Sequence, residues 1–277
     1  MKKGRNLRSV NTDGGVNLQF KLLSAIGIII IVSGHCYHGG MELAYNWFPP
    51  YSYNLALFVF ISGYFYKTDY EENVGKYIWK RTKRLLIPAY LWNIFYGGMV
   101  AFLGLFGFTI GAKPDLYNLF VMPFVDGEAF QYNLGSWFVY PLFLVCIINV
   151  LFRKFLKLIH LDNEFIVLIV YLAIGMIGIN TALENPTAIN GIVKLLVRTM
   201  FFLPCYEFGR FYKAVLEKKD TLNNVAYFAI IFAVQLILLT FCENLEYTPS
   251  SFTNFNNGFV IPYISSITAI AFWLRVS

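Results

Sequence analysis

Lys21-Leu-Leu-Ser-Ala-Ile-Gly-Ile-Ile-Ile-Ile-Val-Ser-Gly-His35 is an apolar run with a cation at one end and a histidine at the other. The run predicts a helix that crosses a membrane, over residues 17–37. On that helix Lys21 and His35 differ by a net rotation of about 40° and a rise of about 21 Å, so they lie near one face but toward opposite sides of the bilayer. An ionisable side chain in a span is costly and indicates function, although a histidine near a helix end can also lie among lipid headgroups.

The rest of the chain shares this apolar character. Of its 277 residues, 57% are hydrophobic and 14% are charged, and the mean hydropathy is +0.56. A soluble domain carries about 25% charged residues and lacks repeated apolar runs of about 20 residues. Apolar runs and their flanking turn residues predict eight spans, at about 17–37, 50–66, 85–108, 136–152, 165–180, 195–212, 222–241 and 258–276. The predicted fold class is an all-α, polytopic membrane helix bundle, with residues 1–16 as a basic cytosolic tail and residues 17–277 as one transmembrane domain.

The positions of the lysines and arginines predict the orientation of the bundle. With the N-terminus inside, 19 of the 22 fall in inner segments, whereas Lys113 and Lys194 fall outside and Arg198 lies within the sixth span. Cytoplasmic loops carry an excess of these cations, so the pattern puts the N-terminus and Lys21 at the inner face and His35 in the outer half. The formal charge of +6 lies mainly in short loops beside the spans, where topology and anionic lipid explain it. We therefore expect no nucleic-acid partner.

One cationic cluster is denser than topology requires. Lys80-Arg81-Thr82-Lys83-Arg84 places four cations in five residues at the inner entrance of the third span. Guanidinium groups pair bidentately with phosphate oxygens, and this site would face the cytosol. The cluster is therefore either a phosphate-binding patch or a purely topogenic signal.

Other residues of the spans have structural interpretations. Arg198 lies near the outer end of its helix, so we expect its side chain to snorkel to the interface. Glu207 and Arg210 lie three residues apart and are expected to pair at the inner end of the same helix. Trp137, in an aromatic stretch at the start of the fourth span, is typical of an interfacial aromatic belt.

Two further segments allow a structural and a functional interpretation. The Ser62-Gly63 pair in the second span is a packing notch for a neighbouring helix, or else it leaves room beside His35. The outer loop at about 109–135 combines acids with aromatic residues. Those residues would bind a sugar hydroxyl, fold back as a lid, or lie solvated at the interface.

The cysteines do not form a recognisable framework. Cys36, Cys146, Cys205 and Cys242 fall mostly within apolar runs and lack paired spacing. We infer no disulfide framework, no zinc site and no other metal site. A bridge between Cys36 and Cys242 is the one alternative, because both are expected on the outer side.

Several stretches, taken in order, resemble the acyltransferase-3 family of bacterial integral membrane acyltransferases. They are Ile31-Val-Ser-Gly-His35 in the first span, Leu57-Phe-Val-Phe-Ile-Ser-Gly-Tyr-Phe65 in the second and Lys80-Arg-Thr-Lys-Arg-Leu-Leu-Ile-Pro88 at the third. Weaker matches are Trp137-Phe-Val-Tyr-Pro-Leu-Phe143 and Phe208-Gly-Arg-Phe-Tyr-Lys213. The resemblance extends over residues 17–277.

The resemblance implies an enzyme of the bacterial plasma membrane that moves an acyl group, usually acetyl, from cytosolic acetyl-CoA to a hydroxyl of a cell-surface glycan or polysaccharide. His35 would be the essential reactive group, as a general base or as a transient acyl carrier. The inner cations Lys21, Arg81, Lys83 and Arg84 would bind the donor. The expected partners are the lipid bilayer, acyl-CoA and the glycan acceptor, with acetyl-CoA as a substrate rather than a permanently bound cofactor.

The chain departs from the family pattern in two ways. Members usually carry a basic residue 11 positions before the histidine, where this chain has Ser24 and its nearest cation is Lys21, on the same helical face. Members also run on through further spans after the helix that ends near residue 277, so we expect a truncated copy or a shortened branch. Both departures favour the alternative function, a non-catalytic polysaccharide-export or sensor module of the same fold.

Overall fold

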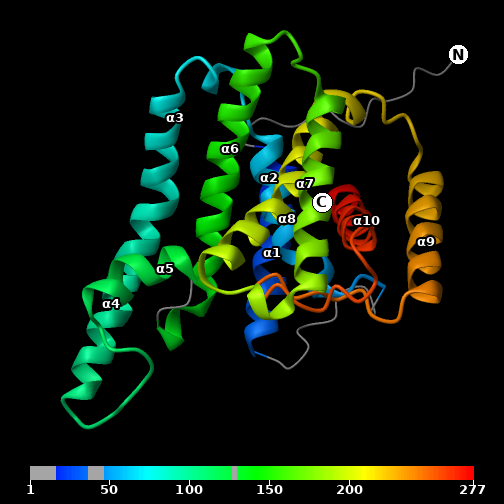
Figure 1. The fold of residues 1–277 in the computed structure, drawn as a ribbon. Coiled ribbons are helices and arrows are strands. Elements are labelled where there is room, and N and C mark those ends of the chain that lie inside the picture. Colours follow the sequence, from blue (N-terminus) through cyan, green and yellow to red (C-terminus); the bar gives the residue numbers. More distant parts are fainter. Residues whose placement is uncertain (1–16, 37–46, 127–129) are drawn as a thin grey trace, which may run out of the picture.

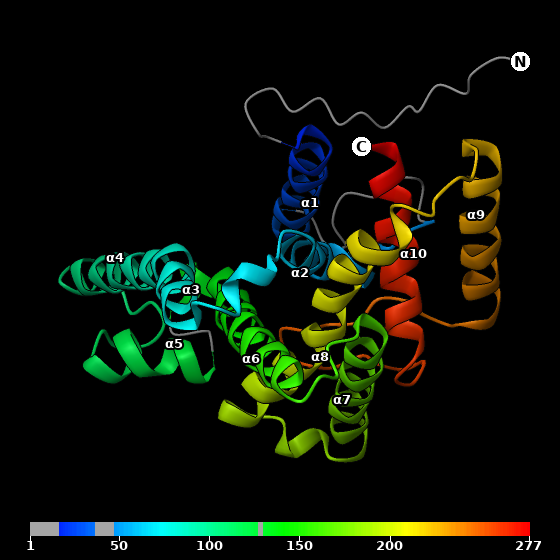
Figure 2. The ribbon, with the colours of Figure 1, turned by 90° about the horizontal axis from the view of Figure 1, so that it is seen from above.

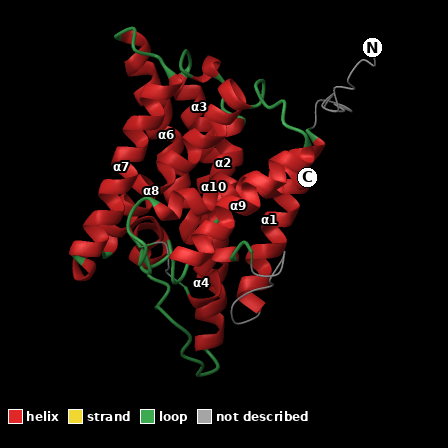
Figure 3. Cartoon of the chain, turned by 90° about the vertical axis from the view of Figure 1, so that its right-hand side faces the viewer, coloured by secondary structure: helices red, strands yellow, loops and turns green. Residues whose placement is uncertain are grey.

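The computed structural model describes residues 17–36, 47–126 and 130–277 of the chain. Within these ranges the chain forms helices joined by loops, and its β-pairing is limited to an isolated bridge between Thr248 and Thr253. Figure 3 shows the helices filling the molecule. The predicted all-α class is confirmed.

The main helices are α1 (Leu18–Cys36), α2 (Asn54–Tyr64), α3 (Val74–Arg81), α4 (Ile87–Gly104), α6 (Val139–Leu158), α7 (Glu164–Glu184), α8 (Gly191–Phe211), α9 (Asn224–Phe241) and α10 (Ile261–Val276). The shorter helical segments are η2 (Pro50–Ser52), η3 (Thr68–Tyr70), η4 (Thr82–Leu86), η5 (Tyr117–Val121), α5 (Met122–Val125), η6 (Gln131–Phe138), η7 (Pro186–Ala188) and η8 (Tyr212–Leu216). Because α3, η4 and α4 are continuous, they count as one helix. The eight predicted spans then correspond in order to α1, α2, α3–α4, α6, α7, α8, α9 and α10.

Five helical stretches of the described chain are long and apolar enough to cross a membrane: Leu18–Cys36, Val74–Gly104, Gly135–Leu158, Glu164–Glu184 and Asn224–Phe241. The helices α2 and α10 are apolar but shorter, and α8 carries charged residues. The protein is therefore a multi-pass membrane helix bundle.

Successive helices alternate in direction (Figure 1). The start of α1 meets the end of α10, where the Gln19 amide donates to the Leu274 carbonyl at 2.6 Å, and Arg210 at the end of α8 pairs with Glu164 at the start of α7. We call this end the basic end, because the cations that close α6 and α8 lie there and α3, which begins there, carries Lys80 and Arg81 within its eight residues. At the opposite end the Tyr51 hydroxyl donates to the Gly34 carbonyl. The alternation fits the predicted topology, and the cytosolic assignment of the basic end remains a prediction.

The helix α8 lies at the centre of the bundle and packs against α2, α6 and α7. Two glycines allow α2 and α8 to approach backbone to backbone. A Cβ atom on Gly63 would lie 1.8 Å from the Tyr206 carbonyl oxygen, and one on Gly209 would lie 1.9 Å from the Phe60 carbonyl oxygen. The packing-notch interpretation of Ser62-Gly63 is therefore the correct one.

The same contacts exclude the other interpretation of that pair. The Phe20 ring, at the start of α1, stacks on Tyr64 at 4.0 Å. Gly63 thus lies level with the basic-end start of α1, whereas His35 lies near the opposite end of the helix. The expectation that the notch leaves room beside His35 is wrong, because α1 and α2 are antiparallel.

The third span begins earlier than the apolar run indicates. The continuous helix Val74–Gly104 has 31 residues and a length of about 46 Å, more than the hydrocarbon core of about 30 Å requires. Its η4 segment is a π-helical turn, in which the Ile87 N–H bonds to the Thr82 carbonyl. Pro88 follows directly and lacks an N–H group, so it disrupts the regular ladder at this point. The α4 part leans away from α2 and α8 (Figure 2).

Candidate active site

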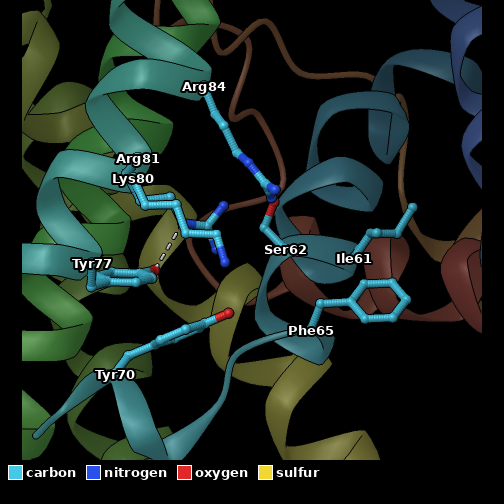
Figure 4. Close-up of a pocket in the computed structure, with 8 residues that line it drawn as sticks. All are labelled: Ile61, Ser62, Phe65, Tyr70, Tyr77, Lys80, Arg81 and Arg84. Atoms are coloured by element: carbon cyan, nitrogen blue, oxygen red, sulfur yellow. Dashed lines mark hydrogen bonds between the residues drawn. The ribbon is translucent and has the colours of Figure 1, made fainter. Parts of the chain in front are cut away.

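A cavity of about 210 Å³ opens between α2 and the α3–η4 helix at the basic end. Its lining residues are Ile61, Ser62, Phe65, Tyr70, Tyr77, Lys80, Arg81 and Arg84. Figure 4 shows Lys80, Arg81 and Arg84 reaching from the α3–η4 helix toward α2, with Tyr70 on the η3 turn beside them. The lining contains three cations and no carboxylate, so the cavity suits an anionic ligand.

Arg81 is held in place by an aromatic neighbour on its own helix. Its Nε atom donates to the Tyr77 hydroxyl at 3.0 Å, and its guanidinium carbon lies 5.2 Å from the centre of the Tyr77 ring. The residues are four apart, which puts them on one face of α3. Tyr77 is itself buried and stacks on Tyr70 at 4.5 Å. The guanidinium is therefore oriented before any ligand arrives, with its remaining nitrogens toward the cavity (Figure 4).

Lys80 and Arg84 complete the cationic wall. The Lys80 ammonium lies 5.4 Å from the centre of the Tyr70 ring, and the Arg84 guanidinium reaches toward the Ser62 hydroxyl (Figure 4). On a regular helix Lys80, Arg81 and Arg84 span an arc of about 100°, so this spacing could have identified the group from the sequence.

Two of the predicted donor-binding residues do not reach the cavity. Lys83 lies over the Trp79 ring at 5.0 Å, on another side of the helix. Lys21 is exposed on α1 and is not among the lining residues. The structure thus brings together Arg81 and Arg84 from the predicted set and adds Lys80, Tyr70 and Ser62, whose grouping depends on how the η3 turn positions α3 against α2.

His35 lies at the other end of α1, exposed, one residue before the helix ends. The backbone beside it is fixed: the Tyr51 hydroxyl donates to the Gly34 carbonyl at 3.1 Å, and a Cβ on Gly34 would lie 2.8 Å from that hydroxyl. The Phe20 ring lies 5.2 Å from the cavity residue Phe65, and the helix rises about 22 Å from Phe20 to His35. The cavity therefore lies level with the start of α1, whereas His35 lies near the end of that helix.

A buried ion-pair network, not predicted from the sequence, joins α6, α7 and α8 at the basic end. Arg153 and Glu207 are both 0% exposed, and the Arg153 Nη2 atom lies 2.7 Å from carboxylate oxygens of both Glu207 and Glu164. Arg210 pairs with Glu164 at 2.8 Å. The predicted pair between Glu207 and Arg210 is wrong, because each finds a partner on another helix.

Arg198 does not snorkel to the interface as expected. It is 1% exposed, and its guanidinium donates to the carbonyls of Asp126, Pro249 and Ser250 from two loops at the opposite end. Its guanidinium carbon lies 4.5 Å from the centre of the Trp137 ring, which is also buried. The prediction that Trp137 lies in an interfacial belt is likewise wrong, because loop carbonyls and this ring solvate the cation inside the protein.

The remaining predictions concern cysteines, metals and the outer loop. Cys36 and Cys242 are both free, so the alternative bridge is not formed. The residues that the structure describes contain no cluster of three or more metal-ligating side chains. In the outer loop Asp126 pairs with Lys194 at 2.7 Å, which is a structural role, and Glu128 lies outside the described residues.

The fold and the site define a multi-pass membrane protein with a cation-lined cavity at the basic end of its bundle. A family model described as an acyltransferase domain matches residues 17–277. The chain therefore belongs to the acyltransferase-3 family, as its motifs predicted, and is a membrane acyltransferase. Comparisons with curated proteins and with solved structures find no match.

Proposed function

We propose that the protein moves an acyl group, in the first instance acetyl, from cytosolic acyl-CoA to a hydroxyl group of a cell-surface glycan at the bacterial plasma membrane. The observation that supports the donor is the cavity of about 210 Å³ lined by Lys80, Arg81 and Arg84. The positive-inside pattern predicts that this end of the bundle lies in the cytosol, where acyl-CoA is made. Arg81 and Arg84 offer bidentate donors to the phosphates, and Lys80 adds a point charge.

The cations outside the cavity have a weaker role. Lys21 is exposed at the start of α1, and Lys83 lies on another side of the η4 turn. Both add to the positive potential around the cavity mouth and thereby raise the local concentration of an anionic donor. We therefore expect their removal to lower the association rate of the donor, and to weaken its binding less than removal of a cation that lines the cavity does.

His35 is the proposed reactive group. As a general base its imidazole takes the proton of the acceptor hydroxyl while the oxygen attacks the thioester carbonyl; the carbon–sulfur bond breaks and the CoA thiolate takes up a proton. As an acyl carrier its ring nitrogen attacks the thioester carbonyl first and the carbon–sulfur bond breaks, which releases the CoA thiolate. The acceptor oxygen then attacks the acyl carbon, the bond from that carbon to the ring nitrogen breaks, and the hydroxyl proton ends on the thiolate. Since about 22 Å of α1 separates the cavity wall from His35, the thioester end of the donor has to extend along α1 in either route.

The same separation favours a second candidate function. If the cavity and His35 never serve one reaction, the bundle acts as a non-catalytic module for polysaccharide export or sensing. The two candidates differ in whether the purified protein consumes acetyl-CoA when a glycan acceptor is supplied.

The test is CoA binding and acetyl-CoA turnover by purified protein carrying Arg81→Gln and Arg84→Gln together. We expect this variant to bind CoA at least tenfold more weakly, with a loss that shrinks as salt rises, since phosphate pairing at a wet surface is screened. Lys83→Gln is the matched control, because it removes a neighbouring cation that does not line the cavity. Equal CoA affinity in the double variant and the wild type would contradict phosphate binding by Arg81 and Arg84. The cationic cluster would then be only a topogenic signal.

A further inference from the structure

Tyr70 presents an aromatic surface at the mouth of the cavity. It closes the η3 turn that joins α2 to α3, and its ring is fixed by stacking on Tyr77 at 4.5 Å and by the Tyr66 ring, whose centroid lies at 5.6 Å. The Lys80 ammonium lies 5.4 Å from the centre of the Tyr70 ring, and the hydroxyl end of Tyr70 points into the cavity (Figure 4). A ring that is already held in place loses little conformational entropy when a ligand stacks on it.

The cavity residues are arranged in a definite order along the bundle. Phe65 and Tyr70, just beyond α2 and before α3, lie at the basic-end mouth. Arg81 follows one turn after Tyr77, and Arg84, beside Ser62, lies farther along the helix toward the opposite end (Figure 4). From the mouth inward the cavity therefore offers an aromatic ring, then cations, then a hydroxyl.

We propose that Tyr70 stacks the adenine base of the donor nucleotide and so makes the site specific for CoA thioesters. The proposal rests on the proposed function and names the part of the donor that the cavity mouth binds. A CoA thioester carries a purine, then phosphates, then a pantetheine arm that ends in the thioester, which is the order of groups that the cavity offers. In this orientation the thioester points along α1 toward the end that carries His35.

The purine is a better fit for Tyr70 than a lipid headgroup is. An anionic phospholipid would pair with the cations through its phosphate. It has no flat aromatic group that could stack on the Tyr70 ring. Stacking of a base on an aromatic side chain is tolerant of the base but sensitive to removal of the ring, with a loss of about tenfold or more. The ring and not the hydroxyl of Tyr70 should therefore carry the effect.

The experiment measures equilibrium binding of CoA and of 4′-phosphopantetheine, which lacks the adenosine, to the full chain in phosphatidylcholine nanodiscs. Tyr70→Ala should weaken CoA binding about tenfold and leave 4′-phosphopantetheine binding unchanged, whereas Tyr70→Phe should keep the CoA affinity. Tyr117→Ala is the control, since Tyr117 is 52% exposed in η5, away from the cavity. The elution profile of each variant in detergent checks its folding.

Each outcome bears on a separate claim. Wild-type protein that binds neither probe would overturn the proposed donor itself. Wild-type protein that binds CoA, with Tyr70→Ala unchanged or weakened equally for both probes, would overturn only the stacking role. CoA binding should also persist in nanodiscs that contain phosphatidylglycerol, and its complete loss there would assign the cations to lipid phosphates instead.

Discussion

Two buried arginines show how single residues carry charge inside this bundle. Arg153 is neutralised by the carboxylates of Glu164 and Glu207, whereas Arg198 is solvated by loop carbonyls and the Trp137 ring. Removing one partner of a buried pair is costly because the other charge stays behind unpaired. Arg153 thus ties three helices together at the basic end, and Arg198 ties two loops to α8 at the other.

The sharpest prediction at this scale concerns His35. His35→Ala should lower acyl transfer by 10²- to 10⁴-fold without changing membrane abundance, the loss typical of a general base, and an essential acyl carrier should lose at least as much. His35→Gln is stricter, because glutamine keeps a hydrogen-bonding group but cannot exchange a proton near neutral pH. Initial rates of acyl transfer by the purified variants measure both.

Controls for His35 come from the other two histidines. His160→Ala changes an exposed histidine of the loop after α6, at the basic end, and should keep full activity. His38, which lies outside the described residues, is expected to lose far less activity than His35 when replaced by alanine. Full activity in His35→Gln would show that His35 is an interfacial residue. It would contradict the proposal that His35 is the reactive group of the enzyme.

Glu71 predicts a pH dependence of stability. It is buried in the turn before α3, and burial together with nearby Asp162 raises the pKa of its carboxyl group, despite the opposing effects of Arg210 and of the Tyr66 hydroxyl. A raised pKa means that the folded state binds the proton more tightly than the unfolded chain does. The associated stability is present below the unfolded pKa and is lost as the pH rises through the folded pKa.

Glu71→Gln should therefore raise the melting temperature more at about pH 8 than at about pH 5, because it removes a buried negative charge and keeps an acceptor for Tyr66. Thermal unfolding in detergent at the two pH values measures the difference. Glu72→Gln, at the exposed neighbouring position, should change neither value. An equal shift at both pH values would contradict the pKa assignment.

Among the elements, the crossing of α2 and α8 depends on glycine. A Cβ on Gly209 would meet the Phe60 carbonyl oxygen at 1.9 Å and the Tyr64 backbone nitrogen at 2.8 Å. Backbone atoms at a helix crossing cannot move aside as a flexible side chain can. The two helices would have to separate along their whole contact.

Gly209→Ala should therefore destabilise the protein by about 1–3 kcal/mol or more, the usual cost of overpacking. Gly98→Ala in α4 is the matched control, since its Cβ would meet nothing within 4 Å and alanine favours the helix. Thermal unfolding followed by size-exclusion chromatography compares the two. A Gly209→Ala variant as stable as Gly98→Ala would show that the crossing is looser than the structure has it.

The topology is a property of the whole molecule and can be tested directly. In a chain without native cysteines, a cysteine at Lys76 should label only after permeabilisation, because the positive-inside pattern predicts a cytosolic basic end. Cysteines at Asn256 and at Lys113, in loops of the opposite end, should label in intact cells. Outside labelling at Lys76 would reverse the orientation and remove the cytosolic donor site with it.

The sequence by itself determined the fold class, the positions of the eight helices that correspond to the predicted spans, and their alternation, although only five of the described helical stretches are long and apolar enough to cross a membrane. Those features depend on hydropathy and on the distribution of lysine and arginine along the chain, which are local properties. It also singled out the cluster Lys80-Arg81-Thr82-Lys83-Arg84, because four cations in five residues are denser than topology requires, and two of the predicted donor-binding residues, Arg81 and Arg84, line the cavity. Family membership followed from the order of motifs that include His35 and Ser62-Gly63.

Only the tertiary structure decided which charged residues meet. Glu207 pairs with Arg153 rather than with Arg210, and Arg198 bonds to loops more than 50 residues away from it. It also decided that Lys80 and Tyr70, and not Lys83, line the cavity. The physical reason is that partners within a bundle are set by helix direction, by rotation about the helix axis and by close approaches such as that of α2 and α8, none of which has a local signature in the chain.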